Sequence, residues 1–201
     1  MNFKKDNYII VKNVLNKDVC DIAYNYLLLK RKVANYFFEK KFISEFDQMH
    51  GDWNDAQVPN TYCLYGDILM ETLLTTIKPK MEKITNLKLI ETYAYTRVYK
   101  KGDVLEKHTD RFSCEVSATL NLGGDKWPIY LKNKNKKIKA DLNSGDMLVY
   151  KGEILEHWRD SFKGENCGQV FLHYNDLSSN NAELNKYDTR PFLGLPSFFK
   201  R

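Results

Sequence analysis

The sequence has no apolar run of membrane-spanning length, and Met1 to Asn7 contain no apolar core of a secretory signal. It has few cysteines, and they stand far apart without any CxxC pair: Cys20, Cys63, Cys114 and Cys167. This spacing fits neither a zinc knuckle nor a small disulfide scaffold. We therefore expect a cytoplasmic protein with reduced thiols and no membrane partner.

The chain also lacks a strong excess of one charge, because 31 Lys and Arg against 26 Asp and Glu leave a net charge of only +5. Much of the lysine lies in residues 132–139, which we interpret as a solvated hairpin loop rather than a nucleic-acid surface. We do not expect a nucleic-acid partner. With 201 residues, 43% of them hydrophobic and 28% charged, the composition is typical of one soluble globular domain spanning 1–201.

Histidine is scarce as well, and the chain has only four: His50, His108, His157 and His173. One of them stands in the sequence His108-Thr109-Asp110. On an extended backbone, residues i and i+2 point to the same side, so this imidazole and this carboxylate can share one metal ion. His157 follows after enough chain for several strands, and it can complete a three-ligand face.

Two imidazoles and one carboxylate on one face of an octahedron leave coordination positions open, as in non-haem Fe(II) oxygenases. A zinc site with the same ligands would favour tetrahedral geometry and activation of water instead. His-x-Asp alone also occurs where the carboxylate caps a turn and the histidine lies at the surface. Two of so few histidines stand where a metal site on a sheet needs them, and this favours the metal.

The first part of the chain predicts helices. Asn16 is a candidate N-cap for a helix that carries Val19, Ile22 and Leu27 at helical spacing. A second helix should begin after Asp67 and kink or split at Pro79. Four aromatic residues between these helices are candidate packing anchors: Phe37, Phe38, Phe42 and Phe46. Residues 50–60 form a loop in which His50 and Trp53 could line a substrate entrance or simply hold the loop down.

No long helix is expected after Asn86. Strand-like runs follow at residues 89–99, 104–110, 114–122, 128–131, 147–150, 154–157 and 169–174, separated by glycine turns. Short strands at this spacing favour a sandwich or jelly roll. The fold class expected is α+β, mainly β, with helical support at about 13–86 packed on one outer face, a core at about 87–176 and an appendage at 177–201.

The motifs in combination resemble a known family. Tyr99-x-x-Gly102, His108-x-Asp110, Gly145-Asp146 and His157 stand in the order found in 2-oxoglutarate and Fe(II)-dependent oxygenases, particularly the prolyl-hydroxylase-like branch. A group of uncharacterised bacterial and viral members has similar short elements, here His108–Arg111, Trp127-Pro128, His157–Arg159 and Phe171–Tyr174.

The resemblance implies a double-stranded β-helix (a cupin-like jelly roll), with His108, Asp110 and His157 as iron ligands and Tyr99 beside 2-oxoglutarate. It implies Fe(II), 2-oxoglutarate and O2 as cofactors, and hydroxylation of a small-molecule or peptidyl substrate, for which an amino acid or peptidyl side chain is our first candidate. Two alternatives remain open: a cupin-like metal or small-molecule binding protein without oxygenase activity, and a metal-dependent hydrolase or isomerase.

The sequence departs from the branch at one place. The strand after the distal histidine normally carries a Lys or Arg for the far carboxylate of 2-oxoglutarate, but this chain has Cys167-Gly168-Gln169 there. A buried dianion needs a charge partner, and a guanidinium meets a carboxylate with two parallel hydrogen bonds. Arg159 is our first candidate, ahead of Arg97 and Lys132, although it could equally form a surface pair with Asp160 or Glu156.

Candidate substrate contacts are Arg111, Trp158 and His173, which adjoin the motifs in sequence. The simpler interpretations of the last two are a core tryptophan and a hydrogen-bonded strand histidine. The segment 177–201 carries apolar residues that could dock on the domain or on a second copy of it. The oligomeric state does not follow from the sequence.

Overall fold

The computed structural model describes residues 2–44 and 47–201. Within these ranges the strands form two antiparallel sheets. In spatial order, the six-stranded sheet consists of β1 (Tyr8–Val11), β8 (Met147–Tyr150), β5 (Val116–Gly124), β10 (Asn166–Asp176), β3 (Leu89–Lys100) and β2 (Tyr62–Tyr65). The four-stranded sheet consists of β4 (Leu105–His108), β9 (His157–Arg159), β6 (Ile129–Asn133) and β7 (Lys136–Ala140).

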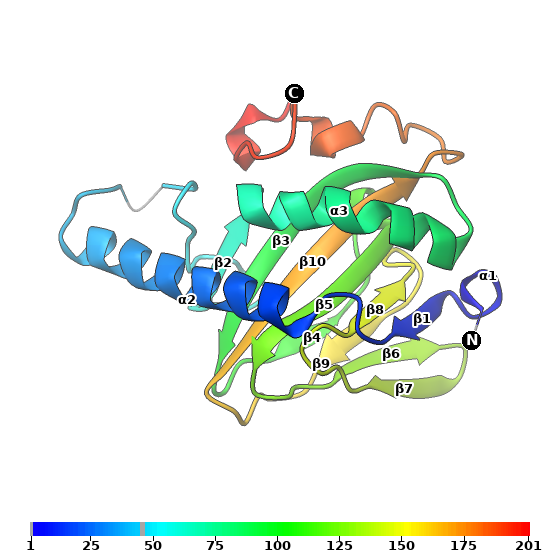
Figure 1. Ribbon diagram of the computed structural model, residues 1–201, viewed down its shortest axis with the longest axis horizontal. Helices are drawn as coiled ribbons and strands as arrows, with labels where there is room; N and C mark the ends of the chain where they lie inside the picture. The colour runs from blue at the N-terminus through cyan, green and yellow to red at the C-terminus, as the bar shows by residue number, and fades with distance from the viewer. Residues whose placement is uncertain (1, 45–46) are drawn as a thin grey trace.

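The helices precede most of the strands, as expected. The elements are α1 (Phe3–Asp6), α2 (Lys17–Glu39), α3 (Ile68–Thr85) and the 3-10 turns η1 (Phe112–Cys114), η2 (Lys186–Thr189) and η3 (Ser197–Phe199). Both predicted caps form, because the Asn16 side chain accepts from the Val19 N–H at 2.9 Å and Asp67 accepts from Leu69 and Met70. Such a cap contributes about 1 kcal/mol. Figure 1 shows α2 and α3 on the same side of the larger sheet.

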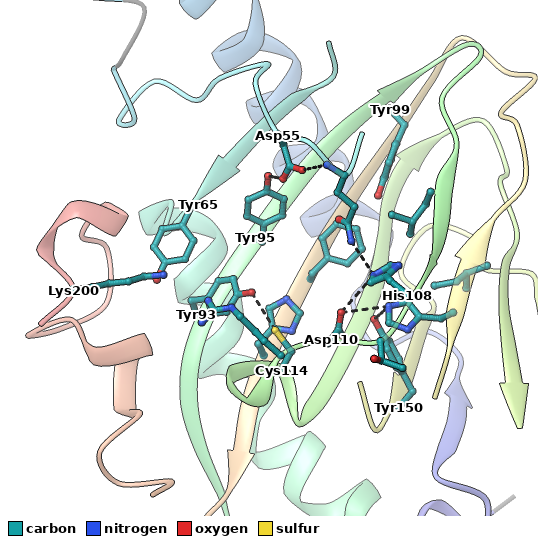
Figure 2. Close-up of a pocket in the computed structure, with 18 residues that line it drawn as sticks. Asp55, Tyr65, Tyr93, Tyr95, Tyr99, His108, Asp110, Cys114, Tyr150 and Lys200 are labelled. Carbon is teal, nitrogen blue, oxygen red and sulfur yellow. Dashed lines mark hydrogen bonds and ion pairs between the residues drawn. The ribbon is translucent and has the colours of Figure 1, made fainter. Parts of the chain in front are cut away.

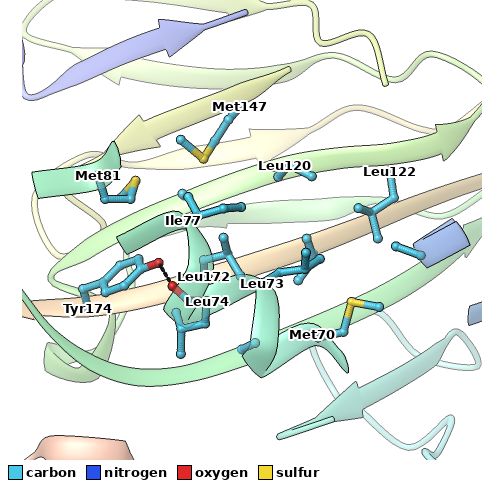
Figure 3. Packing of buried hydrophobic residues seen from close by; sticks show 14 of the residues in the cluster. Met70, Leu73, Leu74, Ile77, Met81, Leu120, Leu122, Met147, Leu172 and Tyr174 are labelled. Carbon is cyan, nitrogen blue, oxygen red and sulfur yellow. Dashed lines mark hydrogen bonds between the residues drawn. The ribbon is translucent and has the colours of Figure 1, made fainter. Parts of the chain in front are cut away.

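The largest hydrophobic core lies between these helices and the larger sheet (Figure 3). The predicted alternation along β5 supplies its sheet side, with Val116, Ala118, Leu120 and Leu122. The helices supply the other side, with Leu27, Leu73, Leu74, Ile77 and Met81. The opposite face of the larger sheet is therefore left to meet the smaller sheet.

A second core fills the space between the two sheets. Leu148 and Tyr150 of the larger sheet pack there with Ile129 and Leu131 of the smaller one. The observed architecture is thus two facing antiparallel sheets, mainly β, with helices on one outer face. This arrangement agrees with the expected fold class and leaves one end of the inter-sheet space for a pocket.

Three local predictions were wrong. Pro79 does not split α3, because the helix continues through it with its apolar face, including Ile77 and Met81, packed on the sheet. The lysine-rich stretch forms the expected hairpin, but most of it is strand rather than loop, since β6 and β7 pair up to a turn with Lys134 at φ 55°. His157 begins a strand rather than ending one, and residues 152–154 form turns.

The C-terminal segment docks on its own domain through buried polar contacts rather than through its phenylalanines. Arg190 Nη2 lies 2.6 Å from Glu71 Oε1 of α3, and both side chains are buried. Phe192, Phe198 and Phe199 remain exposed.

Among the candidate aromatic anchors, Phe42 is exposed and Phe46 lies outside the described residues. Across the described part of the chain, no helix combines the length and apolar character needed to cross a membrane.

Candidate metal centre and its pocket

The predicted ligands His108, Asp110 and His157 come together between the two sheets. His108 is the last residue of β4, His157 is the first residue of β9, and the two positions pair directly in the antiparallel register. Asp110 lies just beyond β4, and its Oδ1 is 3.5 Å from the Nε2 atoms of both histidines. All three donor atoms lie within 4.8 Å of one another, close enough to hold one metal ion.

Both imidazoles are held by main-chain carbonyls on the side away from Asp110. His108 Nδ1 lies 2.8 Å from the Glu106 carbonyl oxygen, and His157 Nδ1 lies 2.9 Å from that of Leu155. A protonated Nδ1 that donates to a carbonyl leaves the lone pair of Nε2 free for a metal. The acceptors are thus backbone carbonyls two residues upstream, which need no particular side chain.

Asp110 is held by its own set of contacts. Its N–H donates to the Gly152 carbonyl at 2.9 Å, and the Ser117 hydroxyl donates to Oδ2 at 3.2 Å. A Cβ on Gly152 would overlap both Asp110 Oδ2 and the Cys114 carbonyl oxygen. The turn after β8 therefore requires glycine where it supports the carboxylate.

The electrostatics favour a cation among these three groups. Burial raises the pKa of Asp110, but the contacts with His108 and His157 outweigh burial and hold the pKa far below its usual range. Burial lowers the pKa of His108, yet the contacts with Asp110 and the Glu106 carbonyl raise it overall. The carboxylate therefore stays ionised, and a proton or a divalent cation held beside it offsets its negative charge.

The cluster opens into a cavity of about 340 Å³ (Figure 2). Tyr65 of β2 and Tyr93, Tyr95 and Tyr99 of β3 line it, and the three tyrosines of β3 share one face of the strand because they stand at i, i+2 and i+6. Lys200 reaches it from the C-terminal segment. The remaining lining residues are Asp55, Gln57, Leu105, His108, Thr109, Asp110, Arg111, Cys114, Ile129, Tyr150, His157, Phe171 and His173.

The loop before β2 contributes residues that the sequence did not indicate. Asp55 Oδ2 pairs with Arg97 Nη2 at 2.7 Å, and Gln57 Oε1 accepts from Arg97 Nη1 at 3.2 Å. The Gln57 amide nitrogen lies 2.9 Å from His108 Nε2, on the side of the ring that a metal would face. No motif marks Asp55, Gln57 or Lys200, whereas Tyr93 and Tyr95 follow from the alternation along β3.

Arg159 and Tyr99 carry buried polar atoms that have no hydrogen-bond partner in the described part of the chain. Arg159 is fully buried, its Nη1 donates to the Trp127 carbonyl, and the Trp127 ring packs on Tyr99 at 4.7 Å. Among the described residues, the buried side-chain N and O atoms without a hydrogen-bond partner are Arg159 Nε, Arg159 Nη2, Tyr99 Oη and Arg97 Nε. Nε and Nη2 form one edge of the guanidinium, the edge that binds a carboxylate through two parallel hydrogen bonds. These atoms fit the carboxylate of a buried anionic ligand.

The other cation candidates are less well placed for that role. Lys132 is exposed and belongs to a hollow on the outside of the smaller sheet. Arg97 is buried but already pairs with Asp55. Gln169 stands in the segment where related sequences carry the Lys or Arg, and its side chain forms hydrogen bonds with Cys167 and Thr119. The alternative considered for Arg159, a surface pair with Asp160 or Glu156, does not occur, because the side chain is fully buried.

Only two of the three suggested substrate contacts lie at the cavity. Arg111 and His173 line the cavity. Trp158 does not: it stacks on Tyr130 at 5.7 Å on the outer face of the smaller sheet, because it alternates with His157 along β9. His173 lies 2.9 Å from the Ser117 hydroxyl, and burial lowers its pKa to about 4, so it is neutral at pH 7.

The two loop residues suggested for a substrate entrance also lie elsewhere. The His50 ring contacts Phe37 and pairs with Asp47, and Trp53 packs between Phe38 and Tyr62. Neither residue lines the cavity of the candidate metal centre. They hold down the loop that delivers Asp55 and Gln57, which is the simpler of the two roles considered.

No protein-family model matches the sequence, and no curated protein matches it. Solved structures do resemble it in fold. A prolyl-4-hydroxylase from Pseudomonas putida is 12% identical with a TM-score of 0.65, over 87% of this chain and 95% of that one. A prolyl hydroxylase from Trichoplax adhaerens, in complex with a hypoxia inducible factor peptide fragment, is 14% identical with a TM-score of 0.63, over 89% and 90%.

A third structure is HygX from Streptomyces hygroscopicus with nickel, 2-oxoglutarate and hygromycin B bound. It is 13% identical with a TM-score of 0.64, over 88% of this chain and 85% of that chain. At these identities the likeness shows the fold alone. This chain therefore has the fold shared by prolyl hydroxylases and HygX, and it carries a possible His-Asp-His metal site between its two sheets.

Proposed function

We propose that this protein is a non-haem Fe(II) dioxygenase that couples oxidative decarboxylation of 2-oxoglutarate to hydroxylation of a substrate. The observation that carries this proposal is a partly buried cluster of two imidazoles and one carboxylate, together with a fully buried arginine two residues after His157 on β9 that has an unused guanidinium edge. The two imidazoles and the carboxylate suit Fe(II) with open coordination positions, and the arginine suits a carboxylate of the cosubstrate. The fold agrees with this assignment without deciding it.

His108, Asp110 and His157 would hold Fe(II), while the Arg159 edge and the Tyr99 hydroxyl would hold 2-oxoglutarate. When bound, the metal and this cosubstrate together supply the oxidising chemistry with O2. The donor set fits the metal because both Nε2 atoms face an ionised carboxylate. The arginine fits the cosubstrate because its unpartnered N–H groups are buried and therefore gain most from an anion.

The protein's own part is to orient these groups and exclude water. The Glu106 and Leu155 carbonyls fix the tautomers and ring orientations of the two histidines. The Ser117 hydroxyl donates to the Asp110 carboxylate, and the Gly152 carbonyl accepts from the main-chain N–H of Asp110. The apolar walls formed by Leu105 and Ile129 keep solvent from one side of the cluster.

We further propose an amino acid or peptidyl side chain as the substrate, acted on in the cytoplasm. The similar structures bind a peptide in one case and hygromycin B in another. The cavity suits such a ligand because Tyr65 and Tyr93 form an aromatic wall, with Arg111 and Lys200 at its edge. The alternative of a binding protein without oxygenase activity rested on the missing cation, and Arg159 now supplies a buried candidate for it.

The test is an anaerobic Fe(II) titration with and without 2-oxoglutarate, in which the weak visible charge-transfer band of the chelate is recorded. We expect a band that needs both components and disappears in Asp110→Ala. His50→Gln is the matched control, because His50 lies outside the cavity and should keep the band. Tight zinc binding without any such band would refute the oxygenase and favour a hydrolase or a binding protein.

A further inference from the structure

Helix α2 carries a second apolar face that the fold does not use. Its inner side is buried against the larger sheet through Cys20, Ala23, Leu27 and Ala34. On another side the helix exposes five large side chains, each between 36% and 64% accessible to solvent: Val19, Ile22, Leu29, Val33 and Tyr36. A set of this size on one helix is more than the scattered apolar residues of an ordinary surface.

The spacing of these residues is that of a helix–helix seam. Together with Tyr26, which is partly buried, they follow one another in alternating steps of 3 and 4 residues along α2. This is the heptad repeat with which two helices pack side by side. In this description, the α2 stripe means Val19, Ile22, Tyr26, Leu29, Val33 and Tyr36.

Further exposed apolar side chains extend the α2 stripe at its C-terminal end. Phe42 is 68% exposed, and its ring lies 6.2 Å from that of Tyr36. Ile68 is also exposed, and it follows Asp67, which accepts hydrogen bonds from Tyr26 and Lys30 of α2. Figure 1 shows the C-terminal turns of α2 reaching beyond the larger sheet, at the left of the view, where a second molecule can approach.

We infer that the α2 stripe is the seam of a homodimer in which α2 packs antiparallel against α2 of a second copy. The exposed charges of the helix support a second copy as the partner. At its beginning Lys17 pairs with Asp21, so the excess charge there is that of Asp18. Toward its end the exposed charges are Lys32, Glu39 and Lys40, which sum to a positive charge. An antiparallel pair related by a two-fold axis sets the acidic beginning of each helix toward the basic end of the other, and the helix dipoles also oppose each other.

The area available predicts a weak dimer. A standard interface buries about 800 Å² on each partner, and the five exposed side chains of the stripe alone would supply roughly half of this. Phe42 and Ile68 add to the patch at its end. We therefore expect a dimer that dissociates on dilution. The inference uses no residue of the metal centre and does not depend on the proposed function.

The first experiment is sedimentation velocity on the whole chain over a wide range of concentrations. We expect a concentration-dependent shift from monomer to dimer, which Ile22→Glu and Leu29→Glu should each abolish. Ile154→Glu is the matched control, because Ile154 is 60% exposed on the turn between β8 and β9 and should leave the dimer intact. Far-ultraviolet circular dichroism establishes that each variant is folded.

The second experiment tests the orientation by disulfide formation between variants that each carry one added surface cysteine. All four native cysteines are buried and free, so new surface cysteines dominate the reaction. When the stripes overlap fully and run antiparallel, Val19 of one protomer lies opposite Tyr36 of the partner subunit. Mixing Val19→Cys with Tyr36→Cys under mild oxidation should give the mixed disulfide-linked dimer. Val19→Cys alone should give little disulfide-linked dimer.

Three results would overturn the inference. A monomer at every concentration would show that no second copy covers the stripe. A dimer that survives Leu29→Glu would place the interface elsewhere on the molecule. A dimer in which Val19→Cys cross-links efficiently to itself, and not to Tyr36→Cys, would show that the helices run parallel.

Discussion

His108 and His157 occupy directly paired positions of β4 and β9, with their ring centroids 4.2 Å apart. Residues paired in this way across antiparallel strands point to the same face of the sheet. The strand register therefore sets the distance between the two imidazoles. A shift of one residue in β9 would turn Trp158 inward and His157 outward, and the candidate metal centre would be lost.

Gly152→Ala should weaken metal binding although all three proposed ligands remain. The added Cβ would overlap Asp110 Oδ2 and push the carboxylate away from the histidines. We expect metal affinity to fall by about 10-fold or more, a size typical of changes to the groups that support metal ligands. Isothermal titration with Mn²⁺ or anaerobic Fe²⁺ measures this effect.

Gly102→Ala is the control for that variant. Gly102 has φ +90°, so alanine there is strained, but no atom within 4 Å would clash with its Cβ. It should lower the stability and leave metal affinity unchanged. Equal losses of affinity in both variants would show that general destabilisation, rather than the Asp110 contact, is responsible.

Arg159→Met should weaken 2-oxoglutarate binding, because the buried fork of N–H donors is lost. We expect an increase in the dissociation constant of about 10-fold or more, since charge-assisted hydrogen bonds contribute on the order of 1.5–3 kcal/mol. Arg159→Lys should recover little, because an ammonium group lacks the planar fork. The titration uses the intensity of the Fe(II) chelate band.

Lys132→Met and Arg97→Met test the competing assignments of this role. Lys132 lies on the outside of the smaller sheet and should have no effect. Arg97 pairs with Asp55, so its loss should disturb the pocket wall more than the cosubstrate. A larger loss of 2-oxoglutarate affinity in Arg97→Met than in Arg159→Met would reverse our assignment.

The metal-free protein should lose stability on acidification because of His173. Burial lowers the pKa of His173 from an ordinary value of 6.5 to about 4. The unfolded chain therefore binds more protons than the folded chain between these pH values, and stability falls as the pH drops through this window. The full effect of this one group is about 3 kcal/mol.

Urea unfolding of chelator-treated protein at a series of pH values between 7 and 4 measures this loss. His173→Asn removes the titrating group and should flatten the pH dependence by a comparable amount. If the two proteins show parallel curves, then His173 is not the group responsible for the acid lability.

Arg190→Met should strongly destabilise the protein, because it leaves Glu71 as an uncompensated buried charge. Removal of one partner from a buried ion pair costs about 3–5 kcal/mol. The double variant Glu71→Met with Arg190→Met removes both charges and should recover much of the stability. Denaturant unfolding of the two variants and the wild type makes the comparison, and a double variant no better than the single one would contradict it.

Short-range patterns in the sequence predicted much of the fold. Asn16 and Asp67 begin helices as expected, because capping depends on a side chain and an N–H only two or three residues away. The alternation along β3 and β5 indicated which residues share a face, since a strand has a period of two, but not which face meets the helices and which meets the pocket. The mainly β architecture follows from these repeated local signals.

Errors arose where position depended on distant parts of the chain. Trp158 was suggested as a substrate contact and lies on the outer face, because the inward positions of β9 depend on its pairing with β4 and β6. Pro79 was expected to kink or split α3, but the helix is not split, because the packing of its apolar face onto the sheet stabilises one continuous helix. Local propensity is weak compared with such packing.

The sequence by itself determined the set of chemical groups available for a metal, because few histidines occur and His108 and Asp110 stand at i and i+2. Only the tertiary structure decided that His157 pairs with His108, that Arg159 is buried with a free edge, and that Asp55, Gln57 and Lys200 line the cavity. The physical reason is that these relations join residues far apart in the chain. They are set by strand register and by the packing of two sheets, which local sequence patterns do not encode.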